Sequence, residues 1–243
     1  MFLNPEDATA TIVEDVEKAS LRLAVQALIE FREEALKIFQ VQTEKFEHNL
    51  QDVGEDITRE ALDRMGLSRI EDRLFGKIDY KRARYVFHPE YALRQALFVD
   101  SKTEKDAKTV TLQMSQTSMS VRQERRGTLI DQPGSMPKVW ESGKFHYLTT
   151  IIIVKYHYEQ EQRNTSLKSI IAAAIPNGLL QDRYNPSVED TIWRAGRDAP
   201  TLGEKFRVRL RYGLLERKSP WRVQRISAHG PFSWNDATAL RRE

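Results

Sequence analysis

Residues 97–102 have the sequence Leu97-Phe98-Val99-Asp100-Ser101-Lys102, in which an apolar triplet is followed by an acid and, two positions later, by a lysine. The triplet closes a strand candidate, Ala92–Val99. A second strand candidate, Lys77–Phe87, precedes it and carries Asp79. The deciding pattern is therefore an acid on one strand followed by Asp-x-Lys at the end of the neighbouring strand.

Helices are expected before these strands. Apolar residues recur at three- and four-residue steps through Thr11–Phe46, which predicts one long helix or two stacked ones. A short helix is expected over Asp56–Met65, with Gly66 as its C-terminal stop.

Further strands are expected after them. Leu148–Tyr158 is the clearest central strand, Ser169–Ile175 is shorter, and Phe206–Tyr212 alternates basic and apolar residues. Two polar stretches, Ser101–Arg126 and Tyr184–Glu204, are expected to be irregular and functional. The fold class is α/β (α+β), with a mixed central sheet flanked by helices. We expect a single domain over 1–243, with a helical region at 1–66 and the catalytic sheet at 77–213.

Charge is unevenly distributed along the chain. The net charge is +3, but residues 1–56 carry 13 acidic and 5 basic side chains, so the remainder is strongly basic. A basic body with an acidic end suits contact with a polyanion, although a solvated acidic helix explains the imbalance equally well. The chain has no cysteine, which excludes disulfides and thiolate metal sites. We expect no secretory signal and a cytoplasmic location.

Two carboxylates that converge from adjacent strands can hold a hard cation such as Mg²⁺. Asp79 and Asp100 are the expected metal ligands, with the carbonyl of Ser101 as a further one. Lys102 would stand beside a metal-bound water and orient it. Glu55, before the second helix, is a candidate outer acid. The alternative is structural: Asp79 pairs with a neighbouring basic residue, and Asp100 caps a turn.

Six blocks of sequence, in order along nearly the whole chain, resemble the SfiI-like type II restriction endonucleases of the PD-(D/E)xK nuclease superfamily. One departure from that motif is that Ile78, not proline, precedes the first acid. The blocks are Glu55-Asp56-Ile57-Thr58, Ile78-Asp79-Tyr80-Lys81-Arg82, Val99-Asp100-Ser101-Lys102, Leu167-Lys168-Ser169, Arg183-Tyr184-Asn185-Pro186 and Pro220-Trp221-Arg222.

The resemblance implies a restriction-endonuclease-like core, Mg²⁺-dependent hydrolysis of double-stranded DNA to 5′-phosphate and 3′-hydroxyl ends, an interrupted GC-rich palindrome as the site, and a homotetramer. It places Asp79, Asp100 and Lys102 on the catalytic positions. Ser115–Lys144 matches poorly, which leaves the recognition sequence and the oligomeric state open.

The resemblance also assigns Gly203–Arg209 to the major groove. Arg207 and Arg209 are two positions apart, so on a strand they share a face, and Arg is well suited to guanine. Arg197 and Lys205 are further candidates for DNA contact.

The sequence leaves two other functions open. The chain can be a repair or recombination nuclease that recognises DNA structure, or a DNA-binding protein without catalysis. The second has no need of Asp79, Asp100 and Lys102 together.

Overall fold

The computed structural model describes residues 2–45, 50–64, 83–161, 164–196 and 207–240. The N-terminal helical region consists of α1 (Ala10–Glu30), α2 (Arg32–Lys45) and α3 (Leu50–Asp63). Thr9 caps α1 by accepting a hydrogen bond from the main-chain N of Ile12 at 3.3 Å. Of the two possibilities expected for this region, one long helix or two, the described residues form two successive helices that meet at Phe31.

The third helix differs from its expected bounds. The described part of α3 begins at Leu50, ahead of the expected start at Asp56, and includes Gly54. A Cβ at Gly54 would lie 2.7 Å from Oγ1 of Thr103 and 2.9 Å from Cδ2 of Tyr156. Glycine is needed because α3 passes very close to two strands. Gly66, the expected stop, lies outside the described residues.

The main sheet is mixed, as expected. Its order is β1-β2-β7-β8-β11, with β6 also paired to β7. The strands are β1 (Arg84–His88), β2 (Leu93–Glu104), β6 (Val139–Ser142), β7 (Phe145–Glu161), β8 (Asn164–Ile175) and β11 (Val223–Ser227). The pairing of β2 with β7 is parallel, whereas β1, β6 and β8 each run antiparallel to their partners.

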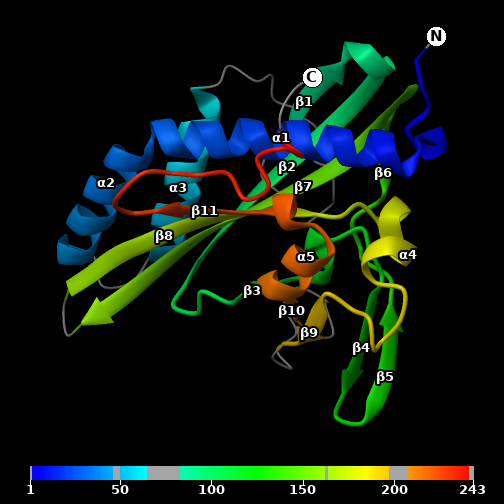
Figure 1. Cartoon of the computed structure of the whole chain (residues 1–243). Coiled ribbons are helices and arrows are strands. Elements are labelled where there is room, and N and C mark those ends of the chain that lie inside the picture. The colour runs from blue at the N-terminus through cyan, green and yellow to red at the C-terminus, as the bar shows by residue number, and fades with distance from the viewer. Residues whose placement is uncertain (1, 46–49, 65–82, 162–163, 197–206, 241–243) are drawn as a thin grey trace.

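Each face of this sheet contributes to a separate apolar cluster. Leu97 of β2 and Val154 of β7 pack with residues of α1 and α2. Phe98 and Ile153 point the other way and pack with residues of a second sheet. Both faces are therefore covered, which explains why β7 contains the unbroken run Ile151–Val154. Figure 1 shows α1 lying across the strands of the main sheet.

The second sheet has three strands in the order β3-β10-β9. They are β3 (Thr109–Leu112), β9 (Trp193–Ala195) and β10 (Val208–Arg211). A separate hairpin, β4 (Val121–Arg125) with β5 (Thr128–Gln132), extends away from the main sheet (Figure 1). The remaining short helices are α4 (Gln181–Tyr184), α5 (Tyr212–Lys218) and the 3₁₀ turns Pro5–Asp7, Pro89–Tyr91, Met114–Gln116, Gly178–Leu180 and Pro220–Arg222.

Several expected bounds were wrong. The strand expected to end at Val99 continues to Glu104, because residues 100–104 pair with residues 153–157 of β7. The stretch Ser101–Arg126 was expected to be irregular, but it contains the end of β2, all of β3 and β4. Short strands with one polar face give little periodic signal and are fixed by distant partners.

Three further differences concern the ends of elements. The stretch 184–204 contains β9, and the strand expected over 206–212 is β10, with Tyr212 opening α5 instead. The strand expected over 77–87 corresponds to β1, which begins at Arg84; residues 77–82 lie outside the described part of the chain.

Of the helices in the described ranges, none is long and apolar enough to cross a membrane.

Candidate active site and basic face

Asp100 and Lys102 lie on one face of β2, because side chains two positions apart on a strand point the same way. Nζ of Lys102 is 2.9 Å from Oδ2 of Asp100, and each side chain is 18% exposed. The carboxylate and the ammonium are thus paired and remain accessible from solvent. This is the face of β2 that also carries Phe98, toward the second sheet.

Gln116 is a neighbour of Asp100 that the sequence did not reveal. Its Nε2 donates to Oδ2 of Asp100 at 2.7 Å. Its Oε1 accepts a hydrogen bond from the main-chain N of Gln113 at 2.9 Å, which fixes the amide so that Nε2 faces the carboxylate. The signal available in the sequence was weak: Gln116 lies in Ser101–Arg126, a stretch expected to be functional but without a motif around it.

The other expected site residues are placed differently. The side chain of Ser101 is buried on the opposite face of β2 from Asp100, and the ligand expected from this residue is its main-chain carbonyl. Glu55 lies within α3, not before it. Asp79, Arg197 and Lys205 lie outside the described residues.

α3 packs on the face of the sheet opposite Asp100. Oγ1 of Thr103 donates to the main-chain carbonyl of Leu50 at 3.0 Å, and the hydroxyls of Thr58 and Tyr156 are 2.9 Å apart. Glu55 therefore belongs to the helix that covers this other face.

The donors near Asp100 suit a hard cation. A part-exposed carboxylate and a main-chain carbonyl are oxygen ligands of the kind that Mg²⁺ takes. Within the described ranges, no three acidic or histidine side chains are grouped closely enough to hold a metal. Asp79, the acid that the sequence assigns to the same site, lies outside the described residues.

Lys155 is the buried counterpart of Lys102. The two are register partners in the parallel pairing of β2 with β7. Nζ of Lys155 is 2.9 Å from Oε2 of Glu104 and also donates to the main-chain carbonyls of Asp106 and Thr109. Burial lowers the pKa of Lys155, and the Glu104 carboxylate partly offsets that effect.

The second sheet presents arginines outward. Val208 and Leu210 are fully buried, whereas Arg209 is part-exposed and Arg211 is exposed, so β10 alternates as expected. Arg209 pairs in register with Thr111 of β3 and with Arg194 of β9. Arg194 was not singled out from the sequence, although its place beside the buried Trp193 fits the same alternation.

Arg222 does not contribute to this basic face. It is 0% exposed, and its guanidinium lies 2.6 Å from Oε2 of Glu17. It also lies over the rings of Tyr184 and Trp221, 4.3 Å from each ring centroid. The Pro220-Trp221-Arg222 block therefore belongs to the core, where Arg222 links α1 to the C-terminal part of the chain.

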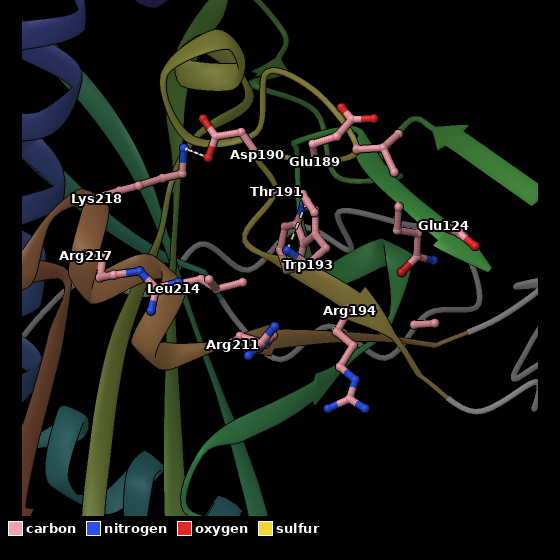
Figure 2. Close-up of a pocket in the computed structure, with 13 residues that line it drawn as sticks. Glu124, Glu189, Asp190, Thr191, Trp193, Arg194, Arg211, Leu214, Arg217 and Lys218 are labelled. Atoms are coloured by element: carbon pink, nitrogen blue, oxygen red, sulfur yellow. Dashed lines mark hydrogen bonds and ion pairs between the residues drawn. The ribbon is translucent and has the colours of Figure 1, made fainter. Parts of the chain in front are cut away.

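Two hollows flank the arginines of the second sheet. A pocket of about 640 Å³ is lined by Arg194 from β9, Arg211 from β10 and Arg217 from α5, as Figure 2 shows. Lys218 lines it too and is paired with Asp190 at 2.5 Å. Three guanidinium groups from three elements, which could each contact phosphate, thus line this pocket together with the carboxylates of Glu124, Glu189 and Asp190.

The second hollow, of about 310 Å³, lies between the end of β2 and the strand of Arg209. Glu104 and Asp106 line one part of it, and Arg207 and Arg209 line another. Thr111 and the start of β3 complete its wall. The end of β2, at Glu104, thus shares this hollow with Arg207 and Arg209.

Comparison with known proteins shows which family the chain resembles. The family described as "Type II restriction enzyme SfiI" matches residues 14–226. The type II restriction enzyme SfiI of Streptomyces fimbriatus is 34% identical over 225 residues, which is 88% of this chain and 84% of that enzyme.

Solved structures show the same fold. The tetrameric restriction endonuclease SfiI bound to cognate DNA superposes with a TM-score of 0.82 at 30% identity, over 96% of this chain and 90% of that one. The restriction endonuclease BglI bound to its DNA recognition sequence superposes with a TM-score of 0.70 at 17% identity, over 90% and 91%. The resemblance and the fold class expected from the sequence are confirmed, and the chain belongs to the SfiI family of type II restriction enzymes.

Proposed function

We propose that this enzyme uses Mg²⁺ to hydrolyse both strands of DNA at an interrupted GC-rich palindrome, leaving 5′-phosphate and 3′-hydroxyl ends. The observation that carries the proposal is the Asp100–Lys102 pair, 2.9 Å apart and accessible, on the face of β2 that also carries Glu104, which lines a hollow with Arg207 and Arg209. Family membership supports site-specific cleavage, whereas the metal, the type of ends and the palindrome are proposed here.

The metal ligands are proposed to be Asp79, Asp100 and the main-chain carbonyl of Ser101; Glu55, on the helix that covers the other face of the sheet, is not among them. Bound Mg²⁺ supplies an activated water and neutralises charge that develops on the attacked phosphate. Gln116 holds the Asp100 carboxylate in place through the 2.7 Å hydrogen bond to Oδ2.

Lys102 is proposed to act on the substrate directly. Its ammonium donates to the nucleophilic water and to a non-bridging oxygen of the scissile phosphate, which orients the attack and stabilises the added negative charge. Because Asp100 already holds the ammonium, the group is positioned before DNA arrives. A bound cation would lower the pKa of the attacking water, so that the proton of this water would pass to solvent as the 3′ oxygen leaves, and no histidine base is required.

DNA recognition is assigned to the arginines of the second sheet. Arg207 and Arg209 are proposed to contact guanine in the major groove, with Arg197 and Lys205 as further contacts. Arg194, Arg211 and Arg217 line the larger pocket and are proposed to contact backbone phosphates, which position the protein without specifying sequence.

Assembly follows from the two-strand cut and from the solved relative. Cleaving both strands of a palindrome calls for two-fold symmetry, so at least a dimer is required. The SfiI structure that this chain resembles is tetrameric and bound to cognate DNA, and we propose the same assembly and ligand here. Because its substrate is DNA, the enzyme is proposed to act in the cytoplasm.

The test is to incubate the purified protein with a sequenced plasmid and Mg²⁺, map the cuts and determine the chemistry of the ends. Cuts at one repeated palindrome with 5′-phosphate ends support the proposal. Preference for branched or nicked DNA would favour a structure-directed nuclease. Glu159→Ala is the matched control for Asp100→Ala, because Glu159 is an exposed acid that pairs with Lys168 on the surface.

A further inference from the structure

A buried lysine joins the strand of Asp100 to the sheet of Arg209. The side chain of Lys155 is 0% exposed, and lysine is almost never fully buried unless its charge is met. Its ammonium has three donors, and they meet the Glu104 carboxylate and the carbonyls of Asp106 and Thr109. The charge is therefore fully hydrogen-bonded inside the protein.

The three acceptors all belong to the connection between β2 and β3. Glu104 is the last residue of β2, and Thr109 is the first residue of β3. The second carboxylate oxygen of Glu104 accepts from the main-chain N of Thr111 at 3.1 Å. Since Thr111 is the register partner of Arg209, one ammonium links β7, the end of β2 and the strand next to Arg209.

The shape of this connection sets the surroundings of the arginines. Glu104 and Asp106 line the smaller hollow together with Arg207 and Arg209. The carboxylate of Asp106 also accepts from the main-chain N of Lys108 at 2.8 Å and from Oγ1 of Thr109 at 2.6 Å. A shift of this connection would move the two acids of the hollow relative to its two arginines. It would also move the end of β2 at Glu104, which lies two residues after Lys102.

Stability alone explains this lysine poorly. Burying the ammonium of Lys155 costs desolvation energy, and its attraction to the part-exposed carboxylate of Glu104 offsets that cost, so that little net stability remains. What such a pair can supply is one defined arrangement of the elements that it joins. Here the elements are the strand proposed to cut and the sheet proposed to contact bases.

We propose that Lys155 is a positioning residue that couples base recognition to cleavage. It holds the strand of Arg209 and the strand of Lys102 in one arrangement, so that correct base contacts place the scissile phosphate at Asp100 and Lys102. The proposal rests on the proposed nuclease function, and it assigns Lys155 no contact with DNA.

The test compares the enzyme with Lys155→Met on two duplexes, the mapped site and the same site changed at one base pair. Methionine keeps an unbranched apolar side chain but has no donor. We expect kcat on the mapped site to fall about tenfold and the preference for it over the changed site to fall by a similar factor. The Kd for nonspecific DNA should stay unchanged.

Glu17→Gln is the matched control. Glu17 also belongs to a buried ion pair, 2.6 Å from Arg222, but it lies in α1. This variant is expected to lower Tm and to leave discrimination between the two duplexes unchanged. If Lys155→Met loses no more discrimination than Glu17→Gln, the positioning role is wrong. Where Lys155→Met does not fold, Glu104→Gln removes the partner charge and is judged by the same comparison.

The absence of cysteine permits a rescue. Lys155→Cys introduces a single thiol, which 2-bromoethylamine converts in denaturant to a sulfur analogue of lysine before refolding. We expect the aminoethylated protein to regain discrimination and the refolded, unmodified protein not to. Equal discrimination by both would overturn the proposal. A wild-type enzyme that cuts no DNA would overturn the proposed function as well, and is recognised before any variant is compared.

Discussion

Lys102 and Lys155 are register partners across the parallel strands β2 and β7, and each lies 2.9 Å from an acid on β2. The side chain of Lys102 is 18% exposed beside Asp100, whereas that of Lys155 is 0% exposed beside Glu104. An accessible ammonium can reach a phosphate, and a buried one can only hold protein groups. The same residue type therefore has two different roles within one row of the sheet.

Lys102→Met is expected to lower kcat by about 10²–10³-fold, because a donor aimed at the developing charge is lost. Binding of DNA should be kept, since the arginines of the second sheet are untouched. Single-turnover cleavage and a binding titration of the same duplex check this. Loss of binding in parallel with loss of cleavage would show that Lys102 only anchors the substrate.

Gln116→Leu is expected to lower kcat less than Lys102→Met does. The variant removes the 2.7 Å hydrogen bond to Asp100 but leaves the carboxylate and Lys102 in place. A higher Mg²⁺ concentration should restore part of the rate, because a misplaced ligand weakens metal affinity. Cleavage is measured against Mg²⁺ concentration, and an unchanged midpoint would contradict the positioning of Asp100 by Gln116.

Arg209→Ala and Arg217→Ala are expected to differ in kind. The first removes a proposed base contact, which costs about 1–3 kcal/mol at one base pair and relaxes the choice there. The second removes a proposed phosphate contact, so binding to all sequences weakens alike. The slope of log K against log salt concentration becomes shallower by about one unit. Titrations at several salt concentrations, on cognate and altered duplexes, distinguish the two. Identical behaviour of both variants would refute the division.

Arg222→Leu is expected to cost about 3–5 kcal/mol of unfolding free energy, because Glu17 is left buried without its partner. Arg225→Leu is the neighbouring control: its ion pair with Glu216 is part-exposed, so the loss should be under about 1 kcal/mol. Urea unfolding of both variants measures the difference. Similar losses would mean that the buried pair adds nothing beyond a surface pair.

The sequence predicted the elements that are long or strongly periodic. The helices α1 and α2 and the apolar core of β7 follow from local patterns alone. The Asp100–Lys102 pair was also predictable, because its two members lie two residues apart on one strand.

Features that depend on distant residues were not predictable in this way. Gln116 contacts Asp100 only because a 3₁₀ turn folds back on β2. In the sequence, Lys155 is simply a polar residue that follows an apolar run, and nothing near it indicates burial. Arginine is a residue type that is usually found at the surface, and Arg222 is buried only because α1 packs against it. Each of these features is fixed by a partner at least 16 positions away.

Digestion of a large, fully sequenced DNA by the wild-type enzyme and by Asp100→Ala, with Mg²⁺ and with EDTA, tests the central claim most directly. We predict discrete fragments from the wild type with Mg²⁺, and intact DNA from the variant and in EDTA. Intact DNA in every lane, with binding retained, would contradict the claim and point to a DNA-binding protein without catalysis.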